Sequence, residues 1–383
     1  MRNLKVLHIA SFSGNIGDLL SHKGFYPWFS RNLSNNIAWT KFEIRDVFRG
    51  LASFEKDIVP LIEKHDLTVI GGGNYLETWP TNSRTGTSID LDVEFLKNSS
   101  KPIFFNGLGV DVSLGVSEQA AKNLPNFFKA ILSSSNYLLS VRNDGAASAL
   151  SRFTSDSNWF TIPDHGFFGF EKTLGPKPQT PREKIVINIA EDMPELRFGI
   201  SGGIESFIEG FATQLLEIMD THPRYHIQFI PHVFSDVKFA CKVIEKLPDK
   251  RVREAISIAE LDTGVSKGLD AFVHYDDAAL VLANRFHSNI YPLSQGIKTI
   301  GLVNHPQLSN LYSELGSRGV NRESIDLRND LTSLASRVKS LIGSSIDGEG
   351  EKFELMNSME EMRSNFEPTL KRWLDENIGN TVE

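Results

Sequence analysis

An arginine and a histidine, separated by one residue, follow an apolar run in the second half of the chain. Residues 279–284 read as a β-strand, and Arg285, Phe286 and His287 come directly after it. Alternate strand residues point to the same side, so Arg285 and His287 are expected to face one cavity while Phe286 packs away. Arginine forks onto phosphate or carboxylate, and histidine carries a proton near neutral pH. The pair predicts a site for an anionic substrate that needs proton transfer. A buried arginine–carboxylate pair beside a structural histidine is the alternative reading.

Glycine-rich turns follow several predicted strands in the first half of the chain. They are residues 14–18 (Gly-Asn-Ile-Gly-Asp), 71–74 (Gly-Gly-Gly-Asn) and 107–110 (Gly-Leu-Gly-Val). Glycine permits tight turns and the close approach of a ligand to the backbone. The spacing in the first turn is not the dinucleotide fingerprint. Each turn could be purely structural, or it could bind a ligand.

Charged side chains occur at three further strand ends. Arg142 ends one predicted strand, Asp164 and His165 follow another, and His232 follows a third. Ligands of doubly wound sheets bind beyond the carboxyl ends of the strands, so these residues are candidates for the same site. His232 is also open to a structural role, as is common for a single histidine.

Composition limits the kinds of ligand. The chain has 383 residues, 40% of them hydrophobic, and a formal net charge of −8. This charge argues against a general nucleic-acid binder, and an anionic substrate would need local cations and helix N-termini to hold it. The single cysteine, Cys241, excludes an intrachain disulfide and a cysteine-based zinc cluster. The histidines lack a metal-ligand spacing, so we expect no metal site and no bound cofactor.

The N-terminal residues read as a first strand, and no apolar run approaches the length of a membrane span. We therefore expect a cytoplasmic protein, with possible contact to the inner face of a membrane.

Strand and helix patterns alternate in two series, which is typical of parallel α/β sheets. Strands are predicted at 5–10, 41–47, 67–70, 102–106 and 137–141, and then at 184–190, 225–231, 279–284 and 298–303. A helix is predicted at 260–268, among others. Three prolines mark residues 171–182 as a linker. We expect an N-terminal domain over 1–170, a second domain over 183–345, and a helical tail over 346–383. The inferred architecture is two Rossmann-like domains facing a central cleft.

The ordered set of motifs resembles the polysaccharide pyruvyl transferase family. The matching pieces are the three glycine-rich turns, Ser140-Val141-Arg142, Pro163-Asp164, Arg285-Phe286-His287 and the following residues 296–302. The resemblance covers about residues 5–320. It implies a fold similar to the two-domain, GT-B type glycosyltransferases. It also implies transfer of a ketal-linked pyruvate from phosphoenolpyruvate to two hydroxyls of a sugar, in a polysaccharide or its lipid-linked precursor. One departure is Asn143, which stands before Asp144 where the family usually has the acid directly after the arginine.

The resemblance assigns Arg142, Arg285 and His287 to donor binding and catalysis. Each arginine would bind one anion of phosphoenolpyruvate, and protonated His287 would act as the general acid. Further residues are placed by their positions at the strand ends. For the donor these are Ser288, Asn15 and Gly73. For the saccharide acceptor they are Gly72, Asn74 and His165 in the N-terminal domain, and His232 in the second domain. The base that activates the hydroxyls stays open among Asp18, Asp164 and His232.

Two other functions remain open from the sequence. One is a two-domain glycosyltransferase that uses a nucleotide-sugar donor, since the fold does not fix the function. The other is a catalytically silent sugar-binding protein. The sequence leaves open the acceptor sugar, the hydroxyl positions, the ketal stereochemistry and the oligomeric state.

Overall fold

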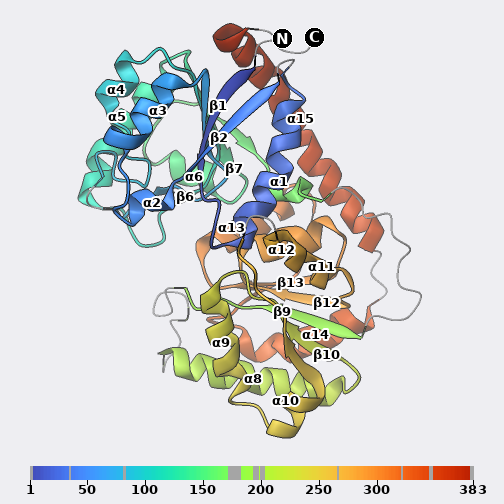
Figure 1. Cartoon of the computed structure of the whole chain (residues 1–383). Helices are drawn as coiled ribbons and strands as arrows, with labels where there is room; N and C mark the ends of the chain where they lie inside the picture. The colour runs from blue at the N-terminus through green and yellow to red at the C-terminus, as the bar shows by residue number, and fades with distance from the viewer. Residues whose placement is uncertain are drawn as a thin grey trace. The chain divides into compact units, whose positions relative to one another are not determined.

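The computed structural model describes residues 3–33, 36–80, 83–170, 183–192, 198, 203–264, 267–320, 322–344 and 348–379 (Figure 1). The chain forms two compact units. Unit 1 contains Met1–Phe12, Ser21–Gly169 and Ser358–Glu383, and unit 2 contains Ser13–Leu20 and Phe170–Asn357. Ser13–Leu20, which we expected in the N-terminal domain, belong to unit 2. Most of the expected C-terminal tail belongs to unit 1. The expected linker, 171–182, lies outside the described residues.

Unit 1 is built on a six-stranded parallel sheet. Its strands, in spatial order, are β2 (Ile37–Glu43), β1 (Leu4–Ala10), β3 (Leu67–Gly71), β5 (Ile103–Leu108), β7 (Tyr137–Arg142) and β8 (Phe160–Ile162). All residues of the central β3, β5 and β7 are buried, as expected for strands covered by helices on both faces. The connection direction reverses between β1 and β3, so a ligand is expected at their carboxyl ends.

Helices and a small second sheet surround this core. The helical segments are α1 (Ile16–Ser30), α2 (Arg45–Phe48), η1 (Phe54–Ile58), α3 (Val59–Lys64), α4 (Val93–Asn98), α5 (Glu118–Leu132), α6 (Ala146–Leu150) and η2 (His165–Phe168). The first residues of α1, through Leu20, belong to unit 2. Short strands β4 (Leu76–Glu77) and β6 (Val110–Asp111) pair in parallel beyond the ends of β3 and β5. The final helix, α15 (Gly348–Ile378), packs Phe366, Leu370 and Trp373 against the unit 1 sheet. Phe353, near the start of the same helix, is exposed.

Unit 2 has the strand order of a Rossmann sheet. The order is β11 (Ile256–Ile258), β10 (His226–Phe229), β9 (Lys184–Asn188), β12 (Leu280–Ala283), β13 (Thr299–Val303) and β14 (Ser324–Asp326), all parallel. Its helical segments are α8 (Gly203–Thr221), α9 (Phe234–Ile244), α10 (Asp249–Ala255), η3 (Gly268–Phe272), α11 (Val273–Asp276), α12 (Phe286–Ser294), α13 (Pro306–Ser317), η4 (Leu331–Ser333) and α14 (Leu334–Gly343). The direction of the strand connections reverses between β9 and β12. The predicted fold class, an α/β protein with two parallel sheets and a C-terminal helix, is confirmed.

Two predicted elements are wrong. The strand expected at 41–47 is β2, which ends at Glu43, because residues 45–48 turn into the short helix α2. The helix expected at 260–268 is a loop over its described residues, and η3 begins only at Gly268. There the Asp262 carboxylate accepts the backbone N–H of Gly264 at 2.7 Å, a local turn that competes with the helix.

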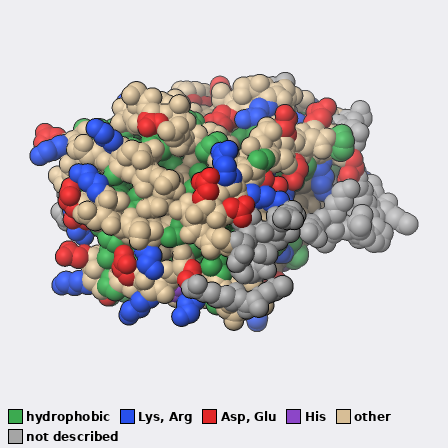
Figure 2. Space-filling view, turned by 90° about the horizontal axis from the view of Figure 1, so that it is seen from above, with side chains coloured by type: hydrophobic (Ala, Val, Ile, Leu, Met, Phe, Trp, Pro, Cys, Tyr) green, Lys and Arg blue, Asp and Glu red, His purple; other side chains and the backbone are tan. Residues whose placement is uncertain are grey.

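The surface carries no extended area of one charge on the face shown in Figure 2, where acidic and basic side chains are interspersed. Within the described residues, no helix has both the length and the apolarity needed to cross a membrane.

Candidate active site

Arg285 and His287 lie at the start of a helix and not at the end of a strand. Strand β12 ends at Ala283, Arg285 is the residue before α12, and His287 is in its first turn. The Asn289 side chain donates to the carbonyls of Ala283 and Arg285, at 3.0 and 2.7 Å. The Ser288 hydroxyl also donates to the Arg285 carbonyl, at 2.8 Å. These bonds turn the chain into a helix, so the predicted strand alternation of Arg285, Phe286 and His287 is wrong.

Asn188 fixes the backbone of Arg285 at the point where the unit 2 sheet reverses direction. This residue ends β9, accepts the N–H of Arg285 at 3.0 Å and donates to the carbonyl of Ile230 at 2.9 Å. Its amide thus joins the carboxyl ends of three strands. In the sequence, Asn188 is distinguished only as a polar residue near the end of a predicted strand.

The Arg285 guanidinium is held between two carboxylates. Its Nε and Nη2 donate to the two oxygens of Asp236, at 2.7 and 2.5 Å, and its Nη1 donates to Asp192 at 2.6 Å. Burial lowers the pKa of Arg285, but the two carboxylates outweigh burial and raise this pKa above its ordinary value. The arginine is therefore a permanent cation, and the arginine–carboxylate pair of the alternative reading is present in the structure.

His232 lies in the same cluster. Its backbone N–H donates to Asp236 at 2.9 Å, and its Nε2 lies 2.8 Å from the Tyr275 hydroxyl. Burial, followed by the nearby charges of Arg285 and His287, lowers the pKa of His232 well below its usual value. Its imidazole is therefore neutral. His232, predicted on the acceptor side, accompanies Arg285 and His287 in unit 2.

The first glycine-rich turn packs against both histidines. The N–H of Ile16 donates to the His232 carbonyl at 3.3 Å, and a Cβ placed on Gly17 would lie 2.5 Å from Nδ1 of His287. Asn15 accepts the Gly17 N–H at 3.0 Å, and its amide donates to Asp18 at 3.4 Å. Because α1 begins at Ile16, Asn15 precedes the helix and Asp18 lies within its first turn. Asn15, Asp18, Arg285, His287, Ser288 and His232 are thus all brought together in unit 2.

We expect Gly17→Ala to impair His287. The added methyl must displace the imidazole, so kcat is expected to fall about tenfold or more while the protein stays folded. The matched control is Gly343→Ala, at a unit 2 glycine where an added Cβ meets no atom within 4 Å. Wild-type turnover in Gly17→Ala would show that the contact does not position His287.

Arg142 is the corresponding buried arginine of unit 1. It pairs with Asp144 at 2.9 Å and with Asp164 at 3.3 Å. The amide of Asn143 accepts the backbone N–H of Asp164 at 3.1 Å. Asn143, the departure from the family pattern, therefore helps to place one carboxylate, and Asp144 contacts the arginine despite it.

The triple-glycine motif lies next to Arg142. A Cβ on Gly109 would come within 2.5 Å of both Arg142 Nη2 and Asn74 Oδ1, so the absence of a side chain leaves room for both groups. Gly73 is covered by the ring of Tyr75, and Gly72 lies in the left-handed region with φ of 83°. Gly72, Gly73, Asn74, Arg142 and Asp164 thus belong to unit 1, as does His165.

His165 is a neutral, buried imidazole. Its Nε2 lies 3.0 Å from Oδ1 of Asn106, and its ring packs 4.9 Å from Trp28. Burial lowers the pKa of His165 to about 3, although nearby Asp164 opposes this shift.

Sequence reasoning misses Glu77. It lies on β4 directly opposite Asp111 on β6, and Asp111 accepts a hydrogen bond from Asn74 at 3.3 Å. Burial, with a smaller contribution from the charge of Asp111, raises the pKa of Glu77 to about 7. A carboxyl group that titrates near neutrality is suited to proton transfer. The two-residue strands that create this pair leave no periodic pattern in the sequence.

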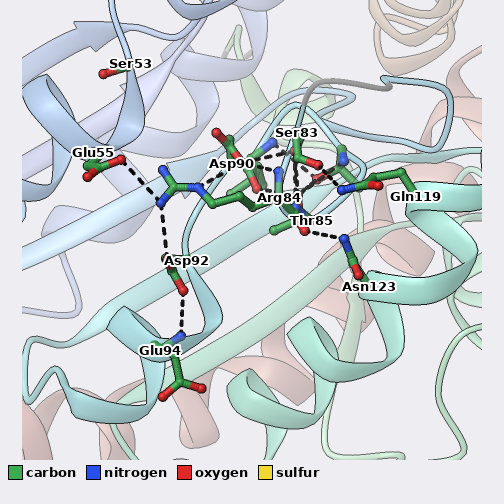
Figure 3. Close-up of polar contacts among 12 residues, drawn as sticks. Ser53, Glu55, Ser83, Arg84, Thr85, Asp90, Asp92, Glu94, Gln119 and Asn123 are labelled. Carbon is green, nitrogen blue, oxygen red and sulfur yellow. Dashed lines mark hydrogen bonds and ion pairs between the residues drawn. The ribbon is translucent and has the colours of Figure 1, made fainter.

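The loop that leads to Ser88, a partner of Glu77, is held by a polar network, shown in Figure 3. Arg84 forms ion pairs with Glu55, Asp90 and Asp92, at 3.6, 3.5 and 3.2 Å. Asn123, from α5, donates to the Arg84 carbonyl at 2.7 Å. Ser88, in this loop, donates its hydroxyl to Glu77.

Glu77→Gln should alter the pH dependence of stability. The pKa of Glu77 in the folded protein lies above the ordinary 4.5. The protonated carboxyl group therefore contributes fully to the free energy of unfolding below about pH 4.5, and this contribution is lost as pH rises through 7. The variant should lose less stability than the wild type over this range, by on the order of 2–3 kcal/mol. Urea unfolding at pH 4.5 and 8 measures the difference. Glu63→Gln, at an exposed position, is the control. Parallel pH profiles of all three proteins would contradict the assignment.

Comparison with known proteins now identifies the family. A family model described as polysaccharide pyruvyl transferase matches residues 11–306. The chain belongs to this family. The matched region includes the glycine-rich turns of a polysaccharide pyruvyl transferase, Arg142 and the Arg285–His287 segment. A transferase acting in polysaccharide biosynthesis is the activity that the family implies.

Solved structures share the fold at low identity. MnaA of S. aureus, in a co-structure with UDP, has a TM-score of 0.52 at 11% identity, covering 92% of this chain and 90% of its own. UDP-GlcNAc 2-epimerase from Neisseria meningitidis, bound to UDP-GlcNAc, has a TM-score of 0.53 at 9% identity, covering 94% and 100%. The spinosyn rhamnosyltransferase SpnG has 0.51 at 11%, covering 97% and 100%. These GT-B glycosyltransferases and epimerases establish the fold alone. No curated protein matches the chain.

The described residues include no cluster of three or more histidine, cysteine, aspartate or glutamate side chains suited to a metal ion.

Proposed function

We propose that this transferase moves pyruvate from phosphoenolpyruvate onto two hydroxyls of a saccharide and forms a ketal. The observation that supports it best is the clustering of Arg285, His287 and His232 at the reversal point of the unit 2 sheet. A fixed cation beside an imidazole suits a substrate that carries a carboxylate and a phosphate and reacts by proton transfer.

Proton transfer begins the proposed reaction. His287, protonated, gives its proton to the methylene carbon of phosphoenolpyruvate, and the central carbon becomes electrophilic. One sugar hydroxyl adds to that carbon and loses its proton to a base. A second hydroxyl then displaces phosphate and closes the ketal, and its proton leaves with the base or the phosphate. The donor would be bound by Arg285, with the backbone N–H groups at the start of α12 nearby.

The three candidate bases differ in their surroundings. Asp164 accepts the N–H of Gly166 at 2.7 Å and pairs with Arg142, so its oxygens are already engaged. His232 is buried, with Nε2 beside Tyr275. Asp18 lies in the first turn of α1, in the same unit as His287. Asp18 also accepts a hydrogen bond from Asn15, at 3.4 Å, so its place next to Gly17, which contacts His287, makes it the base candidate that we retain for the donor side.

Calorimetric titration of phosphoenolpyruvate and of UDP into the wild-type protein tests the donor. Saturable binding of phosphoenolpyruvate, with no binding of UDP, would support the proposal. Binding of UDP alone would favour a nucleotide-sugar glycosyltransferase. A second assay follows phosphate release from phosphoenolpyruvate in the presence of methyl glycosides of common hexoses. Phosphate release without any gain in sugar mass would contradict ketal transfer.

A further inference from the structure

The two carboxylates on Arg285 differ in burial and in the edge that they contact. Asp236 is 2% exposed and takes the Nε–Nη2 edge in a bidentate pair. Asp192 is 32% exposed and contacts the guanidinium through Nη1. Arg285 itself is 14% exposed. One carboxylate is thus part of the interior, and the other reaches the guanidinium from the solvent side.

Asp236 also organises the surrounding backbone. Its Oδ2 accepts the N–H groups of His232 and Val233, at 2.9 and 3.3 Å, in addition to Nε of Arg285. A carboxylate with so many donors cannot leave without exposing several unsatisfied groups. Asp192 is partly exposed and accepts its hydrogen bond from Nη1 of the guanidinium, so its displacement leaves the bidentate pair with Asp236 intact. The end of the guanidinium next to Nη1 is therefore the part that an incoming anion can reach.

We propose that Asp192 is an internal competitor for the donor anion and sets donor specificity, whereas Asp236 positions Arg285. This inference rests on the proposed function, since it concerns the same anion site. In the free protein the Asp192 carboxylate occupies the position on Nη1 that a substrate carboxylate or phosphate would take. A ligand must replace that contact, so a compound with several negative charges has the advantage over a monoanion. Phosphoenolpyruvate satisfies this requirement, and pyruvate does not.

The consequence is that two carboxylates on one arginine have opposite effects on anion binding. Asp192→Asn removes the competing charge, and the affinity for phosphoenolpyruvate is expected to rise about tenfold, the size of one charge-assisted hydrogen bond. Pyruvate, which we expect to bind the wild type poorly, should gain at least as much. Asp236→Asn should weaken binding of both ligands, because the guanidinium loses its fixed orientation.

The test is calorimetric titration of phosphoenolpyruvate, pyruvate and UDP into the wild type and the variants. The matched control is Asp326→Asn in the same unit. Asp326 is 29% exposed and pairs with Arg328 at 2.9 Å, away from the strand-reversal point. This control should leave all affinities unchanged. Thermal unfolding checks that each variant is folded, and Asp192→Asn decides the proposal even if Asp236→Asn fails to fold.

Each outcome has a definite meaning. Tighter binding of phosphoenolpyruvate and pyruvate to Asp192→Asn supports the proposal. Unchanged or weaker anion binding in this variant overturns it, and Asp192 is then a structural partner of the arginine. If phosphoenolpyruvate binds to no protein but UDP binds more tightly to Asp192→Asn, the competitor role stands and the proposed donor fails. If no anion binds to any variant, Arg285 is not an anion site and the competitor role is refuted.

Discussion

Arg285→Ala is expected to lower kcat/KM for phosphoenolpyruvate by about 100-fold or more, which is at least about 2.7 kcal/mol of transition-state stabilisation. The guanidinium is the fixed cation of the unit 2 cluster, and Asn188 and Asp236 hold its backbone and side chain in place. The rate of phosphate release at a limiting concentration of phosphoenolpyruvate measures this decrease in kcat/KM. A decrease of less than about threefold would exclude Arg285 as the donor-binding cation.

Alanine at this position also has a structural cost. It leaves the buried Asp236 without its cation, and breaking a buried pair costs about 3–5 kcal/mol. Thermal unfolding must therefore accompany the kinetics. Arg285→Lys is the more informative variant, because it keeps the charge but cannot contact both oxygens of Asp236 and the donor together. Lysine is expected to restore little activity. Full recovery by lysine would mean that charge alone, without the fork, binds the donor.

The sequence is most informative where a segment is apolar on both faces. Strands β3, β5, β7, β12 and β13 are predictable within one or two residues because parallel strands under two helical layers are continuously hydrophobic. The edge strands β11 and β14 have three residues each and partly exposed side chains, so they carry no comparable pattern. The turn into a helix at residues 285–287 escapes prediction because side-chain bonds from Asn289 and Ser288 determine it, and apolarity does not.

The partners of the site residues could not be predicted. Asp192 and Asp236 lie 93 and 49 positions from Arg285, and only the order of strands β9, β10 and β12 brings them together. The sequence places an arginine and a histidine at the carboxyl edge of the sheet, which follows from motif position alone. It cannot show that the arginine is already neutralised. Glu77 escapes notice for the same reason, since its pKa depends on burial and on Asp111 across a two-residue ladder.

His287→Asn is expected to separate donor binding from turnover. Asparagine keeps a polar amide near the imidazole position but cannot donate a proton as an acid at neutral pH. The Kd for phosphoenolpyruvate should stay within about threefold of wild type, because Arg285 still binds the anion. Loss of general acid catalysis should lower kcat by about 100- to 10,000-fold.

The control for this variant is His274→Asn. His274 belongs to α11 in the same unit and is partly exposed, and the bond that it accepts from Lys184 is at its backbone carbonyl and not at its ring. This control should keep wild-type kcat and Kd. In His287→Asn, wild-type turnover would rule out the proton-donor role, because the substituted amide has no acidic proton to give to the methylene carbon. Loss of donor binding together with turnover would instead make His287 part of the anion site, beside Arg285.

The contact of Gly17 with the His287 ring predicts the same pattern, in weaker form, for Gly17→Ala. Agreement between these two variants would place the proton donor at the start of α12.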